Sequence, residues 1–162
     1  MKYIVAPWRK EYILQAFDME KCIFCSALNL NNDRKALILH RAEYNFIILN
    51  RYPYNPGHLM IAPYRHLDSI EKSKKEEAFE MTELLQLCLK ILRKKYNPQG
   101  FNTGMNLGRS AGAGVTSHYH LHIIPRWTGD SNIMPIIGKT KVVLEDLKST
   151  YDQLVPLFKE AI

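Results

Sequence analysis

Three histidines alternate with apolar residues in the segment His118-Tyr119-His120-Leu121-His122. Alternation is the period of a β-strand, so we expect the three imidazoles on one face of a strand and the apolar side chains on the other. A buried polar ring costs free energy unless it is hydrogen-bonded, bound to a metal or used in chemistry. Because this segment holds three of the six histidines of the chain, we interpret it as a functional site.

A histidine row of this kind suits phosphoryl chemistry. A neutral imidazole is a nucleophile near neutral pH, because its ordinary pKa is about 6.5. Attack on phosphorus would give a phosphohistidine intermediate that passes its group to a second acceptor. His120 is the predicted nucleophile, since His118 and His122 flank it and can donate to phosphate oxygens. Two other interpretations stay open here, namely a metal site and a polar face hydrogen-bonded to the next strand.

A loop of small residues, Gly108 to Gly114, directly precedes the histidines. Residues without bulky side chains let backbone N–H groups approach an anion closely. We therefore predict that Gly112, Ala113 and Gly114 bind a phosphate group beside the histidine row.

The elements that must position these residues are predicted to form an α+β fold, which is an antiparallel sheet with one long helix and a C-terminal helix. Apolar patterns and turn residues predict strands over 36–41, 45–50, 58–63, 101–107 and 118–124, a helix over 76–96, and a C-terminal helix over 144–162 that is interrupted or shortened by Pro156. Residues 8–13 show no clean period, so a loop or short helix is expected there. We expect one domain over 1–162.

Charge and cysteine content limit the classes of partner and the cellular compartment that we expect. The net charge of +6 favours anionic partners, but the lysines are scattered as on solvated helices, which argues against specific nucleic-acid binding. Three cysteines without a signal peptide indicate a reducing compartment, and no apolar run reaches transmembrane length. A cytoplasmic protein that contacts no membrane is the expectation.

Several segments together resemble the histidine triad (HIT) family of nucleotide hydrolases and transferases. They are 118–124, the block 50–66 with Pro56-Gly57-His58 at the start of a strand, 104–108 and 125–130, and the likeness covers about residues 20–137. Within the family, Tyr52-Pro53-Tyr54-Asn55-Pro56-Gly57-His58, Asn106-Leu107-Gly108 and Pro125-Arg126-Trp127 look most like the diadenosine tetraphosphate phosphorylase branch.

The resemblance implies a reaction and roles for its residues. Members of that branch cleave dinucleoside polyphosphates with inorganic phosphate as acceptor, so His120 would form a covalent nucleotidyl intermediate and His122 would contact the α-phosphate. Asn50 would contact ribose or phosphate, Asn106 would orient the leaving group, and Trp127 would line the substrate site. That branch often has a serine where this chain has Gly114, with Thr116 or Ser117 as substitutes, so water is the other acceptor to consider.

Cys22 and Cys25 have the spacing of a metal half-site or of a redox dithiol. No thioredoxin-like βαβ pattern surrounds them, and two unliganded core cysteines are a third interpretation. A structural zinc site needs four ligands. Resemblance to bacterial and archaeal family members implies His66 and His118 as the other two, with zinc joining the N-terminal segment to the triad strand.

Several further residues have more than one possible role. His58 is expected near the nucleotide or in a hydrogen bond to the triad, and Arg126 is expected on a distal phosphate or paired with an acid. Phe24, Phe46 and Ile48 are expected in a base-binding wall or in the core. Cys88 is expected in the core, and His40 is interpreted as an ordinary histidine.

The alternative functions are a nucleoside phosphoramidase, a sugar-1-phosphate nucleotidylyltransferase and a non-catalytic nucleotide-binding protein. The resemblance also implies a homodimer formed by joined sheets.

Overall fold

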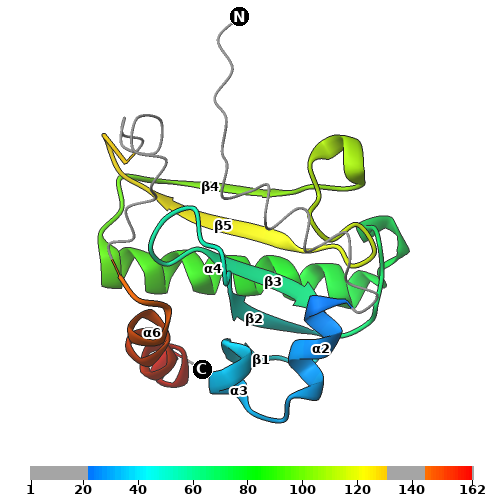
Figure 1. Ribbon diagram of the computed structural model, residues 1–162, viewed down its shortest axis with the longest axis horizontal. Coiled ribbons are helices and arrows are strands. Elements are labelled where there is room, and N and C mark those ends of the chain that lie inside the picture. The colour runs from blue at the N-terminus through cyan, green and yellow to red at the C-terminus, as the bar shows by residue number, and fades with distance from the viewer. Residues whose placement is uncertain (1–21, 131–144, 162) are drawn as a thin grey trace, which may run out of the picture.

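The computed structural model describes residues 22–130 and 145–161 and has an α+β fold (Figure 1). Five antiparallel strands form a sheet in the order β1-β2-β3-β5-β4. In chain order the elements are α2 (Ile23–Asn29), α3 (Asp33–Ala36), β1 (Ile38–Arg41), β2 (Asn45–Leu49), β3 (Leu59–Pro63), η1 (Ile70–Lys72), α4 (Lys75–Tyr96), β4 (Gly100–Met105), η2 (Arg109–Ala111), β5 (Leu121–Arg126) and α6 (Leu147–Ala161). The expectation for residues 8–13, and both ends of the expected motif-bearing core, lie outside the described residues.

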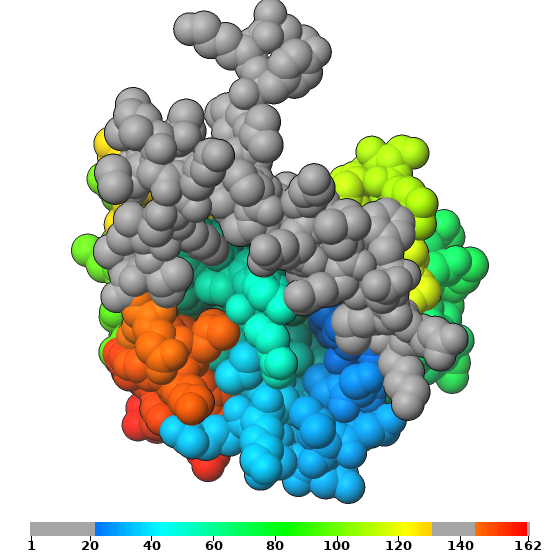
Figure 2. Space-filling model, viewed as in Figure 1, coloured from blue at the N-terminus to red at the C-terminus, as the bar shows by residue number. Residues whose placement is uncertain are grey.

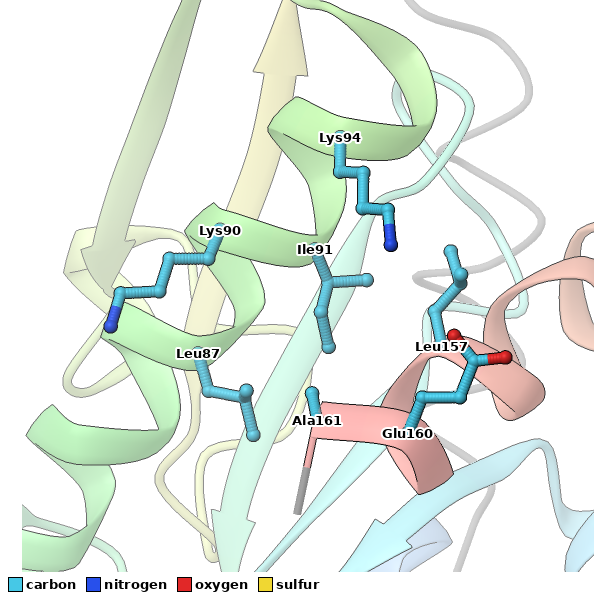
Figure 3. A pocket seen from close by; sticks show the side chains of 7 residues that line it. All are labelled: Leu87, Lys90, Ile91, Lys94, Leu157, Glu160 and Ala161. Carbon is cyan, nitrogen blue, oxygen red and sulfur yellow. The ribbon is translucent and has the colours of Figure 1, made fainter.

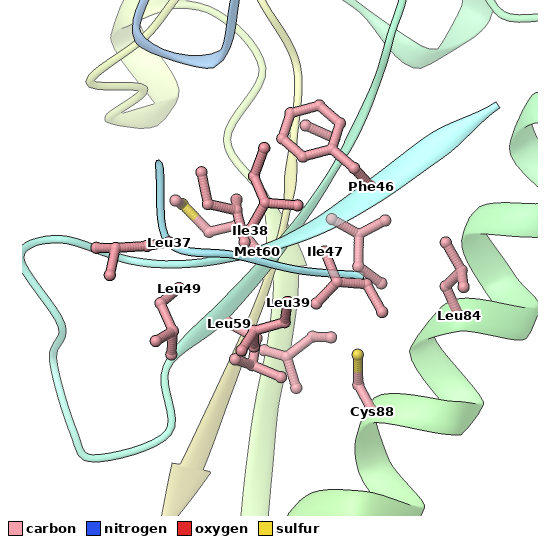
Figure 4. Packing of buried hydrophobic residues seen from close by; sticks show 14 of the residues in the cluster. Leu37, Ile38, Leu39, Phe46, Ile47, Leu49, Leu59, Met60, Leu84 and Cys88 are labelled. Carbon is pink, nitrogen blue, oxygen red and sulfur yellow. The ribbon is translucent and has the colours of Figure 1, made fainter. Parts of the chain in front are cut away.

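The long helix α4 packs across one face of the sheet (Figure 1). Leu84 and Cys88 of this helix face side chains of the central strands, including Ile47 and Leu59 (Figure 4). Every residue of β2 and β3 is buried, which is expected of central strands covered on both faces. Cys88 is therefore a core residue, as predicted.

The apolar period predicts α4 almost to the residue, because the polar groups at its ends also favour a helix. The Glu77 carboxylate accepts the Lys74 N–H at 2.8 Å and two hydrogen bonds from Arg65, which satisfies one of the unpaired N–H groups of the first turn. At the other end Asn97 adopts a left-handed conformation, with φ of 45°, and ends the helix.

The first four predicted strands agree with the observed ones to within two residues, but the triad strand was predicted to begin too early. β5 begins at Leu121, so His118 and His120 lie in an extended segment that precedes the sheet. The predicted alternation of side chains is still observed, because the Tyr119 ring between them points to the α4 side, where its hydroxyl lies 2.6 Å from that of Ser73. The backbone N–H of Tyr119 donates to the Leu67 carbonyl oxygen.

The prediction that Pro156 interrupts the C-terminal helix is wrong. Within the described residues α6 runs through Pro156 without a break. Proline removes one intrahelical hydrogen bond, but Tyr151, Leu154 and Phe158 on the same helix are buried beside β1, and this burial holds the helix together across it.

Two short helices, α2 and α3, were not predicted. In Figure 2 the cyan surface, which includes α3, borders the orange surface of α6. Arg34 of α3 makes a bidentate ion pair with Asp152 of α6, at 3.0 and 2.7 Å. This pair joins the two ends of the described chain.

A shallow cavity of about 350 Å³ lies between α4 and α6. Leu87, Ile91 and Leu157 form its apolar lining, and Lys90, Lys94 and Glu160 surround them (Figure 3). None of the predicted site residues lines this cavity. Among the described residues, no helix combines the length and apolar character that a membrane span requires.

Candidate functional site

His118 is buried, and each of its ring nitrogens faces a defined group. Its Nε2 lies 2.9 Å from the Pro63 carbonyl oxygen, which can only accept, so Nε2 carries the proton. The lone pair of Nδ1 is then directed at the sulfurs of Cys22 and Cys25, at 3.3 and 3.7 Å. Burial lowers the pKa of His118 to about 4, so the ring is neutral at physiological pH.

The ring of His120 is also oriented by a carbonyl group. Its Nδ1 lies 3.0 Å from the His118 carbonyl oxygen, so Nδ1 donates and the lone pair belongs to Nε2. Phe24 packs against this ring with 4.8 Å between centroids, and the centroid of the His122 ring lies 4.7 Å away. Burial lowers the pKa of His120, against the effect of its hydrogen bond to His118.

A chain of contacts leads from His122 to a fourth histidine, His58, and on to Tyr54. The Tyr54 N–H donates to His58 Nδ1 at 3.1 Å, so the proton of a neutral His58 is on Nε2. That nitrogen lies 2.9 Å from His122 Nδ1 and donates to it, which leaves the proton of His122 on its own Nε2. The expected hydrogen bond from His58 to the triad region is therefore present.

Asn50 lies beside this chain, half-buried at the end of β2. Its Oδ1 accepts the Tyr52 N–H at 2.9 Å, so the other atom of the amide is the donor Nδ2. Nδ2 approaches His58 Nε2 at 3.4 Å, but both atoms carry hydrogens, so this contact is not a hydrogen bond and the His58 proton goes to His122.

The four predicted metal ligands come together from three segments. The ligand atoms of Cys22, Cys25, His66 and His118 all lie within 4.8 Å of one another, and Cys25 Sγ is 3.3 Å from His66 Nδ1. Tetrahedral zinc, with bonds of about 2.3 Å to sulfur and about 2.05 Å to nitrogen, places its ligand atoms about 3.3–3.8 Å apart. Burial and the adjacent Cys22 raise the pKa of Cys25, so paired thiolates need a cation between them. The cluster fits zinc.

The glycine loop uses part of its backbone to close on itself. The Gly112 N–H donates to Arg109 O at 2.9 Å and the Ala113 N–H donates to Gly108 O at 3.3 Å. These two groups, predicted to face a phosphate, are thus engaged within the loop. Asn106 approaches the Gly112 carbonyl through Nδ2 at 3.5 Å, which places its amide beside the loop.

Trp127 is not brought to the histidines by the sheet. It follows the last residue of β5, five residues after His122, which corresponds to about 16 Å along a strand. Its backbone N–H donates to Asp130 at 3.0 Å, and the same carboxylate binds Arg126 through two nitrogens. Arg126 is therefore paired with an acid, one of its two expected environments.

Three contacts of the site have no signal in the spacing of the histidines. The first is the contact of Phe24, which is fully buried against His118 and His120 and comes from a helix that was not predicted. Phe46 and Ile48, the other candidates for a base-binding wall, are core residues. The stacking of Tyr54 on His58 and the anchoring of Asn55 to the end of β5 join segments far apart in the chain. In the sequence, the two prolines that bracket Tyr54 and Asn55 indicate a rigid connection at this point of the chain.

Residues 31–129 match the family model of the HIT domain. The chain belongs to the HIT family. A Mycobacterium tuberculosis protein named AP-4-A phosphorylase is 40% identical over 119 residues, which are 74% of this chain and 61% of that protein. A bis(5'-adenosyl)-triphosphatase from Dictyostelium discoideum is 28% identical over 133 residues, or 78% of this chain and 89% of that one. The chain thus spans about three fifths of the mycobacterial relative.

Solved structures of HIT proteins have the same fold. A zinc-bound histidine triad family protein from Mycobacterium smegmatis superposes with a TM-score of 0.69 at 21% identity, covering 86% of this chain and 94% of that one. A hypothetical histidine triad nucleotide-binding protein from Sulfolobus tokodaii gives a TM-score of 0.66 at 28% identity, covering 86% and 91%. Both are consistent with the α+β fold expected from the sequence.

Proposed function

We propose that this HIT protein is a nucleotide-processing enzyme that transfers a nucleotidyl group from a dinucleoside polyphosphate, such as diadenosine tetraphosphate, through a covalent bond to His120. The observation that carries the proposal is the hydrogen bond from His120 Nδ1 to the His118 carbonyl, because it leaves the Nε2 lone pair for attack on phosphorus. The mycobacterial relative named AP-4-A phosphorylase supports the substrate class.

The reaction has two displacement steps. In the first, His120 Nε2 forms a bond to the α-phosphorus while the bond from that phosphorus to the bridging oxygen breaks and the remaining nucleotide leaves. In the second, an oxygen of the acceptor attacks the same phosphorus, the P–N bond breaks, and its electron pair returns to His120. The Nε2–H of His122 donates to an α-phosphate oxygen as charge develops in each step.

The remaining predicted residues bind the substrate. Asn50 offers Nδ2 to a ribose or phosphate oxygen, since its Oδ1 is already used by Tyr52. Asn106 orients the leaving group from beside the loop. For Gly112, Ala113 and Gly114 we propose a phosphate-binding role in which Gly112 and Ala113 shape the loop, because their N–H groups close it. Trp127 contacts the distal part of an extended substrate.

Two acceptors remain candidates for the second step. The phosphorylase relative supports inorganic phosphate, and the triphosphatase relative supports water. With phosphate the products of diadenosine tetraphosphate would be ADP and ATP, and with water they would be AMP and ATP.

Zinc has a structural role in this proposal. Cys22, Cys25, His66 and His118 would hold it, and it would fix His118 relative to α2 and the loop after β3. The catalytic steps belong to His120 and His122. The mycobacterial HIT structure described as zinc-bound supports this assignment alongside the distances within the cluster.

The test is turnover of diadenosine tetraphosphate by wild type, His120→Asn and a matched control, His40→Gln, in the presence and absence of phosphate. We expect H120N to lose about three orders of magnitude or more in rate, as removal of a catalytic nucleophile does, and H40Q to keep wild-type activity. Mass spectrometry of wild-type enzyme quenched during turnover should find a nucleotidyl adduct on His120. Undiminished turnover by H120N would refute the proposal.

A further inference from the structure

The connection between β2 and β3, residues 50–58, holds the ring of His58 from its own backbone. The Asn50 N–H donates to His58 O at 3.0 Å, and the His58 N–H donates to Asn55 O at 3.2 Å. The Tyr54 N–H donates to His58 Nδ1, and the Tyr54 ring stacks on the imidazole with 5.1 Å between centroids. The position of Tyr54 and Asn55 therefore decides which nitrogen of His58 carries the proton.

Asn55 is anchored to the far end of β5. Its Nδ2 donates to Pro125 O at 2.9 Å and to Asp130 Oδ2 at 2.8 Å. Two acceptors use both hydrogens of the amide and define its orientation. We call Asn55 and Asp130, with these contacts, the Asn55–Asp130 clasp.

The Asp130 end of the clasp is itself held firmly. Its side chain is only 10% exposed, and the carboxylate accepts hydrogen bonds from Arg126 Nε at 2.6 Å, a second Arg126 nitrogen at 2.8 Å and the Trp127 N–H at 3.0 Å. The Arg126 guanidinium holds the pKa of Asp130 well below its usual range, so the carboxylate is ionised at every pH of interest. Hydrogen bonds to an ionised acceptor are short and strong, which suits a fixed anchor.

We infer that the Asn55–Asp130 clasp is a positioning device that sets the proton on His58 and, through it, the proton on His122. The clasp keeps Tyr54 N–H on His58 Nδ1, so that His58 Nε2 donates to His122 Nδ1 and the His122 proton stays on Nε2, where it can donate to a phosphate. Without the clasp both tautomers of His58 become available, and the fraction of His122 with a proton on Nε2 falls. The consequence for catalysis rests on the proposed function, whereas the consequence for the tautomers does not.

The decisive measurement is long-range 15N–1H NMR of the zinc-loaded full chain without substrate, which distinguishes the two nitrogens of each imidazole. The signals of His58 and His122 are assigned from through-space contacts to Tyr54 and to each other. We expect wild type to have both rings protonated on Nε2, and Asn55→Leu, which is similar in volume but cannot donate, to contain both tautomers of His58. Asp130→Asn keeps a weaker, neutral acceptor and should lie between them.

A remote variant separates positioning from general loosening. Arg34→Ala removes the bidentate pair with Asp152 and should leave both tautomers as in wild type. N55L should also reduce kcat for diadenosine tetraphosphate about tenfold to a hundredfold with KM changed less than about twofold, since a misplaced donor acts on the transition state.

The inference is overturned if N55L and D130N keep His58 entirely protonated on Nε2, or if R34A redistributes the tautomers equally. Should N55L fail to fold, as judged by circular dichroism, D130N carries the same test. If wild type turns over no dinucleoside polyphosphate, the proposed function fails, but the NMR comparison still decides the role of the clasp.

Discussion

Four neighbouring imidazoles differ in what they can do because their neighbours differ. The Pro63 carbonyl accepts a hydrogen bond from His118 Nε2, so the lone pair on Nδ1 faces the cysteine cluster. The His118 carbonyl accepts a hydrogen bond from His120 Nδ1, so the lone pair of that ring is on Nε2. His58, just before the adjacent strand β3, donates its Nε2–H to His122 Nδ1 and so leaves the proton of His122 on Nε2. One residue type thus serves as a candidate ligand, nucleophile and donor, and the difference lies in one hydrogen bond per ring.

The spacing of the histidines predicted which imidazoles lie close together but not which proton each one carries. The metal set followed from the C-x-x-C pair and the family resemblance, and its members do converge. The tautomers could not be predicted, because the groups that set them, such as the carbonyl of Pro63, are adjacent to the triad only in the folded chain. The same holds for Phe24, which comes from a helix with no clear period.

We predict that Cys25→Ser loses bound zinc. A hydroxyl is a poor zinc ligand, and a structural site with three ligands no longer closes a tetrahedron. The zinc content should fall from about one ion per chain to well below that, and the thermal midpoint should drop, because binding free energy of a structural metal is folding free energy. Elemental analysis and thermal unfolding measure the two effects.

Cys88→Ala is the matched control for that experiment. It also removes a thiol, but from the core beneath the sheet, so it should lower stability while leaving the zinc content unchanged. Equal zinc content in C25S and C88A would contradict a metal site at Cys25.

The ion pair of Asp130 predicts a specific dependence of stability on pH. The pKa of Asp130 is lowered in the folded chain by Arg126, so its contribution is fully present above the unfolded value of about 3.9 and is lost as pH falls below it. Wild type should therefore exceed Asp130→Asn by about 1–2 kcal/mol in free energy of unfolding at pH 7, and by less at pH 3. Urea unfolding at the two pH values measures the difference, and a constant gap would contradict it.

At the scale of elements, the tight turn before β3 depends on Gly57. This residue has a φ of +70°, and a Cβ built on it would lie 2.9 Å from Tyr96 Cε2 and 3.1 Å from Leu92 Cδ2 of α4. We predict that Gly57→Ala destabilises the protein by about 2–4 kcal/mol, combining the cost of a left-handed conformation with overpacking. Chemical denaturation measures it.

Gly100→Ala is the control for this turn, because a Cβ at Gly100 would meet nothing within 4 Å. It should change the free energy of unfolding by less than about 1 kcal/mol, as most surface substitutions do. A similar loss in both variants would show that the approach of α4 to the turn is unimportant.

The helix α4 and the first four strands were predicted well, whereas α2, α3 and the start of β5 were not. The helix α4 has one apolar stripe over its whole length, so its pattern is unambiguous. The start of β5 was misplaced because His118 and His120 alternate like a strand, although the His118 ring bonds to the Pro63 carbonyl and the His120 ring bonds to the His118 carbonyl. For α3, an available signal was missed, since Asn32 caps the helix by accepting the Lys35 N–H.

At the scale of the molecule, one face of the sheet packs against α4 and the opposite face of β5 carries His122 of the candidate site. Leu121 and Ile123 of β5 are buried, with α4 packed on the strand, while His122, between them in sequence, points to the opposite face. The site therefore rests on a sheet whose central strands are fully buried. This arrangement places His122 on a strand that packs against α4, and the proposed mechanism requires a donor held in position.

The strand β4 predicts how two copies would associate. Among residues 22–130 and 145–161 it is an edge strand, and its residues Asn102, Thr103 and Gly104 are all exposed, so neither face of the strand is well covered. Unpaired edges of this kind favour pairing with another strand, and a second β4 would extend the sheet by joining two copies, as the family resemblance implies. We predict a solution mass of twice 18.8 kDa by light scattering. Thr103→Lys, which places a charge on this edge, should shift the protein toward the monomer, whereas Gln86→Lys, which adds the same charge on the exposed side of α4, should not. A monomeric wild type at micromolar concentration would rule out this association.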